Sequence, residues 1–116
     1  MPMYRPPEPP PSRPPDPGKA PLEFGKHLVL STAHVSLATS QLLANWASLP
    51  VEFQPLTVAA TWYGWFVSTF VVKGDDAARI PPELAEVQRF ARSLDCAYIL
   101  FDCDADEVDG LQRFNW

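Results

Sequence analysis

The sequence has few cysteines, no excess of basic side chains and no long hydrophobic run. It contains two cysteines, whereas a secreted domain of this size usually carries several disulfides. No apolar stretch approaches the ~18–20 residues that a membrane span needs, and prolines stand where a signal peptide would be apolar. We therefore expect a soluble, cytoplasmic protein with no membrane partner.

The charge balance is acidic. Nine Lys and Arg side chains oppose fourteen Asp and Glu side chains, which gives a formal net charge of −5. An acidic chain binds phosphate backbones poorly, because Lys and Arg supply most of the affinity for nucleic acid. The sign makes nucleic acid an unfavourable partner and favours either a basic partner or simple solubility.

The residues of catalytic and metal sites are scarce as well. His27 and His34 have no Cys or carboxylate at metal-ligand spacing, and no Ser-His-Asp or Cys-His arrangement stands out. Cys96 and Cys103 flank one expected strand, whose extended length of ~23 Å holds the sulfurs apart, so we expect two free thiols in or near the core. The sequence predicts no catalytic residue, metal or cofactor, and a protein that is not an enzyme.

Proline is abundant at the N-terminus, where most of the fourteen prolines precede residue 22. Proline fixes φ and removes a backbone donor, so residues 1–22 are expected to form a disordered, extended arm. A docking motif for an aromatic groove is the alternative, although Glu8 and Asp16 interrupt its proline pattern. Residues 23–116 are expected to form one small α+β domain.

Hydrophobic periodicity predicts six main elements in that domain. They are a strand at 28–30, a helix from the Ser36 N-cap to Pro50, strands at 56–61 and 65–72, a helix opening at Pro81-Pro82, and a strand at 98–101. This order, β-α-β-β-α-β, predicts a ferredoxin-like antiparallel sheet with both helices on one face. The end of the chain is expected to fold back, and its residues 111–116 are an alternative fifth strand.

The aromatic stretch from Trp62 to Val72 is the centre of the predicted core. Gly64 interrupts the alternation and indicates a hairpin, since glycine adopts positive φ without penalty. The strand that follows is apolar on both faces. It is therefore expected to be covered on both sides, or to present one face to a partner.

A cluster of acids follows the last expected strand, with no Lys or Arg among them. Together with nearby aromatic side chains, these acids are the predicted partner-binding residues for a basic protein surface. The set comprises Asp102, Asp104, Asp106, Glu107, Asp109, Trp62, Tyr63 and Trp65.

Three other motifs resemble parts of known functional sites. The acids resemble a calcium loop, but Glu107 stands at the glycine position and Arg113 at the bidentate position. Asp102-x-Asp104 after an apolar strand resembles the first motif of haloacid-dehalogenase-type phosphatases, whose later motifs do not follow. Tyr63-Gly64-Trp65 begins like the third-strand motif of RNA-recognition modules, so a single-stranded nucleic-acid binder is one alternative function. A small enzyme of unknown reaction is the other alternative.

The chain resembles a family of short uncharacterised bacterial proteins carried on plasmids and integrative elements, over residues 27–116. The resemblance rests on Tyr63-Gly64-Trp65-Phe66-Val67, Phe101-Asp102-Cys103-Asp104-Ala105 and the closing Asp109-Gly110-Leu111 with Phe114-Asn115-Trp116. It implies no catalytic residues. It implies a context among genes that counter host defences, so an inhibitor of a host nucleic-acid-processing defence complex is the most concrete expectation. The partner's identity and the oligomeric state are not indicated.

Overall fold

The computed structural model describes residues 22–116, so the expected arm lies almost wholly outside the described residues. The helices and strands follow the predicted order. They are β1 (His27–Ser31), α1 (Leu37–Ala47), β2 (Val58–Ala60), β3 (Gly64–Ser68), α2 (Pro82–Ser93) and β4 (Tyr98–Asp102), with short 3-10 turns at Thr32–His34, Val51–Phe53 and Gly74–Arg79. No helix within this part of the chain is long and apolar enough to cross a membrane.

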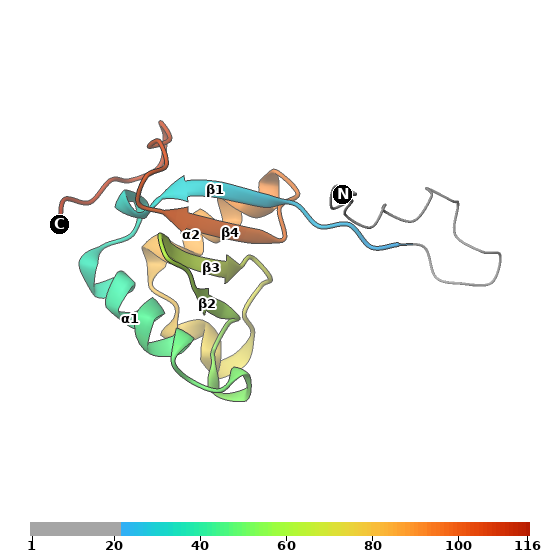
Figure 1. The fold of residues 1–116 in the computed structure, drawn as a ribbon. Coiled ribbons are helices and arrows are strands. Elements are labelled where there is room, and N and C mark those ends of the chain that lie inside the picture. The colour runs from blue at the N-terminus through green and yellow to red at the C-terminus, as the bar shows by residue number, and fades with distance from the viewer. Residues whose placement is uncertain (1–21) are drawn as a thin grey trace, which may run out of the picture.

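The four strands form one mixed sheet in the order β1-β4-β3-β2 (Figure 1). Strand β4 is parallel to β1 and antiparallel to β3, and β2 is antiparallel to β3. The predicted ferredoxin-like antiparallel sheet is therefore wrong in topology. Ile99 and Phe101 of β4 are completely buried, and a strand this apolar takes a central position between two neighbours.

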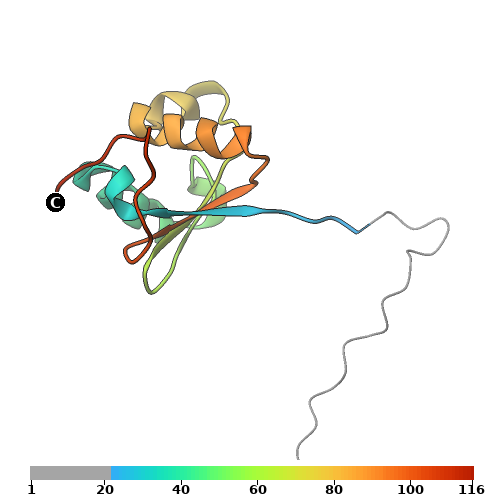
Figure 2. The ribbon, with the colours of Figure 1, turned by 90° about the horizontal axis from the view of Figure 1, so that it is seen from above.

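Both helices pack on the same face of the sheet, as Figure 2 shows for α2. Side chains of directly paired residues share one face. Leu30, Phe101 and Trp65 are consecutive partners across β1, β4 and β3, and they belong to the core or pack against it. The helices contribute Leu43, Trp46, Leu84, Val87 and Ala91 to the same core.

The opposite face of the sheet is not covered by a helix within residues 22–116. Phe66 and Tyr98 lie on it and stack with ring centroids 4.8 Å apart. Val29 of the edge strand is 45% exposed there. The apolar strand at 65–72 was expected either to be covered on both faces or to present one face to a partner. Within the described residues, the structure leaves one apolar face of the sheet uncovered by a helix.

The two helices are joined at their N-termini by Glu83. The Ser36 hydroxyl caps α1 by accepting a hydrogen bond from the Thr39 N–H at 3.2 Å, as the sequence predicted. The Glu83 carboxylate of α2 accepts hydrogen bonds from the Ser36 N–H at 3.1 Å and from the hydroxyls of Ser36 and Thr39. Burial raises the pKa of Glu83, but these hydrogen bonds outweigh it and lower the pKa from its ordinary value of 4.5.

Strand β3 ends at Ser68, earlier than the predicted end at Val72. The Thr69 N–H donates to the Ala97 carbonyl at 3.0 Å, and the Thr69 hydroxyl donates to the Cys96 carbonyl at 2.7 Å. Arg92 of α2 donates to the Thr69 carbonyl at 2.7 Å. The Ala97 N–H does not donate back to the Thr69 carbonyl and instead donates to the Lys26 carbonyl at 2.8 Å, so the β3–β4 ladder ends here, and Phe70 and Val71 are exposed.

The C-terminal segment, residues 108–116, folds back across the ends of β1 and β4 without forming a fifth strand. The Phe114 N–H donates to the Ala33 carbonyl at 2.8 Å. Buried His34 accepts a hydrogen bond from the Val108 N–H at its Nε2 and donates from Nδ1 to the Gln112 carbonyl, both at 2.9 Å. His34 is thus structural, as expected from the sequence.

Gly64 is required by a close backbone approach. A Cβ atom at this position would lie 2.0 Å from the Phe101 carbonyl oxygen and 3.3 Å from Thr32 Cγ2. The hairpin was predicted correctly, but the prediction gave positive φ as the reason for glycine, and the decisive reason is steric.

Candidate functional site: the acidic and aromatic end of the sheet

The carboxyl ends of the parallel strands β1 and β4 lie side by side, at Ser31 and Asp102. Gly64, the first residue of antiparallel β3, pairs with Asp102 at the same end. Three loops therefore meet here: residues 32–36, the β2–β3 hairpin turn at 61–64, and residues 102–109, which we call the acidic turn. In sheets with parallel strands, ligands commonly bind outside such carboxyl ends.

A hydrogen bond joins the hairpin directly to the acidic turn. The Cys103 N–H donates to the Tyr63 carbonyl at 3.0 Å. The Thr61 hydroxyl accepts the N–H groups of Tyr63 and Gly64 at 3.2 and 3.0 Å, which fixes the turn. At its tip Trp62 is 98% exposed, so a full indole ring projects into solvent at this end of the sheet.

A pocket of about 350 Å³ lies between the hairpin, the acidic turn and the C-terminal segment. Three aromatic side chains line it, namely Tyr63, Trp65 and Trp116. The other lining residues are Thr32, Ala60, Thr61, Gly64 and Cys103. None of the lining residues within the described part of the chain is Lys or Arg, so this wall is apolar with a few neutral polar groups.

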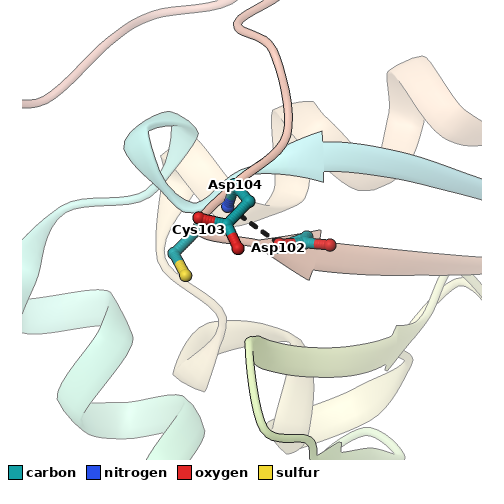
Figure 3. A group of neighbouring side chains, drawn as sticks. All are labelled: Asp102, Cys103 and Asp104. Atoms are coloured by element: carbon teal, nitrogen blue, oxygen red, sulfur yellow. Dashed lines mark hydrogen bonds between the residues drawn. The ribbon is translucent and has the colours of Figure 1, made fainter.

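Asp102, Cys103 and Asp104 form a tight group beside this pocket (Figure 3). One ligand atom from each side chain lies within 4.8 Å of the other two. The Asp102 carboxylate accepts the Asp104 N–H at 2.8 Å, which stabilises the turn. Cys103 and Asp104 are exposed and Asp102 is half-buried. Three consecutive, largely exposed residues make a poorly enclosed cation site, and the calcium-loop pattern also fails at Glu107 and Arg113.

The far half of the acidic turn is partly neutralised by one arginine. Arg113 contacts Glu107 through Nε at 3.0 Å and Asp109 through an Nη atom at 2.9 Å. The expectation that the cluster has no compensating Arg is therefore wrong, because the folded-back segment returns Arg113 to it. Asp104 and Asp106 form no ion pair within residues 22–116.

A family model described as "Family of unknown function (DUF5983) C-terminal domain" matches residues 27–116. The chain belongs to the DUF5983 family. The resemblance to an uncharacterised family is thus confirmed, and the match begins at the first residue of β1. Comparison with curated proteins and with solved structures found no match.

The fold of this DUF5983 domain brings part of the predicted partner-binding set together. Trp62, Tyr63, Asp102 and Asp104 lie at one end of the sheet. Trp65 lines the pocket but is half-buried against the core, so only part of its ring is accessible.

Sequence reasoning missed Trp116 as a lining residue. Folding-back of the C-terminus was predicted, but not the hydrogen bond from Trp116 Nε1 to the Val35 carbonyl, at 2.8 Å, that holds the indole.

The sequence also gave the wrong expectation for Cys103, which is exposed while Cys96 is buried; both thiols are free. The apolar strand before Cys103 suggested a core position, but the chain has already left the sheet there.

Proposed function

We propose that this domain is a non-enzymatic binding module that engages a basic protein surface with its acidic turn and its hairpin aromatics. The observation that carries the proposal is the adjacency of these two elements, joined by the Cys103–Tyr63 hydrogen bond at 3.0 Å. An exposed tryptophan in the hairpin, together with carboxylates that make no ion pair within residues 22–116, combines the two features that anchor and steer protein association.

The charges of the acidic turn support a basic partner. Asp104 and Asp106 are exposed and make no ion pair within residues 22–116, so their charge is available. Opposite charges accelerate encounter, and the acceleration decreases as salt screens the charges. Trp62 supplies apolar area that needs no rearrangement to make contact.

The most concrete form of this function is inhibition of a host nucleic-acid-processing defence complex by a protein encoded on a mobile element. The likeness to accessory proteins suggests it. A surface that binds nucleic acid is basic, so an acidic domain would compete for it with phosphate backbones. This partner would place the protein in the cytoplasm.

Two double variants test the proposal, each removing two negative charges. Asp104→Asn/Asp106→Asn removes unpaired carboxylates, whereas Glu107→Gln/Asp109→Asn removes the two that pair with Arg113. The association rate of the full chain with a lysine- and arginine-rich peptide is measured at low and physiological ionic strength. We expect the first variant to slow association several-fold at low salt and the second to slow it much less.

Equal slowing by both variants would show that only net charge matters, and no slowing by either would remove the acidic turn from the interface. The first variant also serves as the negative bait in affinity capture of the natural partner. A genuine partner is basic, is retained by the wild-type chain and is lost from this variant.

A second candidate function is single-stranded nucleic-acid binding, favoured by the stacked Phe66 and Tyr98 on the open sheet face. The Tyr63 and Trp65 expected to serve it do not lie there, because Tyr63 is in the turn and Trp65 is on the helix-covered side. Retention on a polyanion column at low salt, lost on Phe66→Ala substitution, would support this function. Flow-through of the wild-type chain would exclude it.

A further inference from the structure

Two of the pocket's three aromatic side chains, Trp65 and Trp116, are held in place before any ligand arrives, and Tyr63 is held through its backbone. The indole of Trp116 is fixed at its polar end by the bond to the Val35 carbonyl, yet 54% of the residue is exposed. Trp65 packs against the core, and the Tyr63 backbone is tied to Cys103. Rings fixed at their edges lose little entropy on binding, so the pocket is preorganised.

The wall of the pocket borders the carboxylates of the acidic turn. Cys103 lines the pocket, and oxygens of both Asp102 and Asp104 lie within 4.8 Å of its sulfur. Aromatic faces attract cations through their quadrupole, and a carboxylate beside them adds a direct charge. These carboxylates are negative, and no basic residue within 22–116 lines the pocket, so the surroundings favour a cation over a neutral occupant.

We propose that this pocket receives the guanidinium group of an arginine side chain presented by the basic partner, an inference that rests on the proposed function. Guanidinium is planar, so it stacks on aromatic rings while its N–H groups reach a carboxylate edge-on. It is also more weakly hydrated than the lysine ammonium, which lowers the cost of entering an aromatic pocket. Asp104 is the exposed acceptor at the rim, and Tyr63 and Trp116 are the walls.

The first test uses small probes that do not depend on the wider interface. The full chain is titrated with N-acetyl-arginine amide, with its neutral isostere N-acetyl-citrulline amide and with N-acetyl-lysine amide. The indole N–H resonances of Trp65 and Trp116 are followed by NMR. We expect the arginine probe to shift these resonances and to bind about fivefold or more tightly than citrulline, with lysine between them. Equal binding of arginine and citrulline, or tighter binding of lysine, would overturn the proposal.

Variants locate the probe. Tyr63→Ala removes a wall whose residue is 57% exposed, so the fold should tolerate it, and we expect about fivefold weaker arginine binding. Asp104→Asn should weaken it about two- to fivefold, with a smaller effect at high salt. Phe53→Ala is the matched control, because Phe53 is also an exposed aromatic residue but does not line this pocket, and it should leave probe affinity unchanged. An unchanged affinity in Tyr63→Ala, with circular dichroism showing an intact fold, would refute the site.

The outcomes separate this inference from the proposed function. If the basic peptide binds with the expected dependence on Asp104 and Asp106 but no arginine probe enters the pocket, the inference fails alone. If the arginine probe binds as expected while the basic peptide shows no preference for the intact acidic turn, the pocket is an arginine site but the proposed function fails. The arginine would then not belong to a basic protein partner.

Discussion

The helix-covered face of the sheet and the acidic and aromatic end of the same sheet use neighbouring residues in opposite ways. Phe101 is completely buried under the helices, while Cys103, two residues later, is exposed at the end. Trp65 packs against the core, whereas Trp62 at the hairpin tip is 98% exposed. The difference separates roles: the covered face supplies stability, and the end of the sheet supplies a surface whose side chains stabilise little.

The largest loss of stability is expected where the two regions touch. In Gly64→Val the new Cβ would lie 2.0 Å from the Phe101 carbonyl oxygen, a backbone atom that cannot move aside without shifting β4. We expect a loss of about 4 kcal/mol or more, a large part of the stability of a small domain. Thermal unfolding measures it. Gly25→Ala is the control, because its Cβ would meet only Ala97 Cβ at 3.9 Å, and similar losses in both variants would contradict the steric explanation.

His34→Ala should come next, because it detaches the C-terminal segment from the covered body. The substitution leaves the Val108 N–H and the Gln112 carbonyl without their buried partner. We expect a loss of about 2–4 kcal/mol. The Trp116 fluorescence should shift toward that of a solvated indole as the segment loosens. A destabilised variant with unchanged Trp116 emission would show that His34 supports the core and not the segment.

Glu83→Gln tests the junction of the two helices, where the effect depends on pH. The pKa of Glu83 is lowered in the folded state, so its carboxylate stabilises the fold above the ordinary value of 4.5. That contribution disappears as pH falls through the lower folded value. The variant should thus lose about 1 kcal/mol at neutral pH, and the difference from wild type should shrink below about pH 4.5.

Chemical denaturation at several pH values gives this difference. Glu86→Gln, which removes the same charge from an exposed residue of the same helix, is the control. A constant difference between Glu83→Gln and wild type across the acidic range would mean that the carboxylate charge is not what joins the helices.

The order and type of the elements could be predicted because they depend on local patterns. The Ser36 cap, the prolines that open α2 and the apolar run before Asp102 all act within a few residues. Sheet order could not be read this way, because the pairing of β1 with β4 joins residues such as Leu30 and Phe101, which are far apart in sequence. The end of β3 was missed for the same reason, since the Ala97 N–H pairs with Lys26 and the Thr69 carbonyl with Arg92.

The candidate site was only half visible in the sequence. The density of acids could be seen in the sequence. The ion pairs of Glu107 and Asp109 could not, because Arg113 reaches them only when residues 108–116 fold back. The same fold-back carries Trp116 to Trp65 and Tyr63 to complete the pocket. Aromatic residues of the predicted set line the pocket or stand at the hairpin tip, yet their division between core and surface followed from sheet register.

The smallest change in stability is expected for Trp62→Ala, which separates the two regions most cleanly. Its indole is almost fully exposed, so truncation should alter the free energy of unfolding by less than about 0.5 kcal/mol. By contrast, Trp65→Ala should cost about 2 kcal/mol, because that ring packs against the buried core. If the end of the sheet is an interface, Trp62→Ala should still weaken binding of the basic peptide, since an exposed tryptophan contributes area only when a partner covers it. Scanning calorimetry measures the stability of both variants, and titration calorimetry measures their affinity for the basic peptide. A Trp62→Ala chain that keeps full peptide affinity would leave the hairpin tip without a role in association.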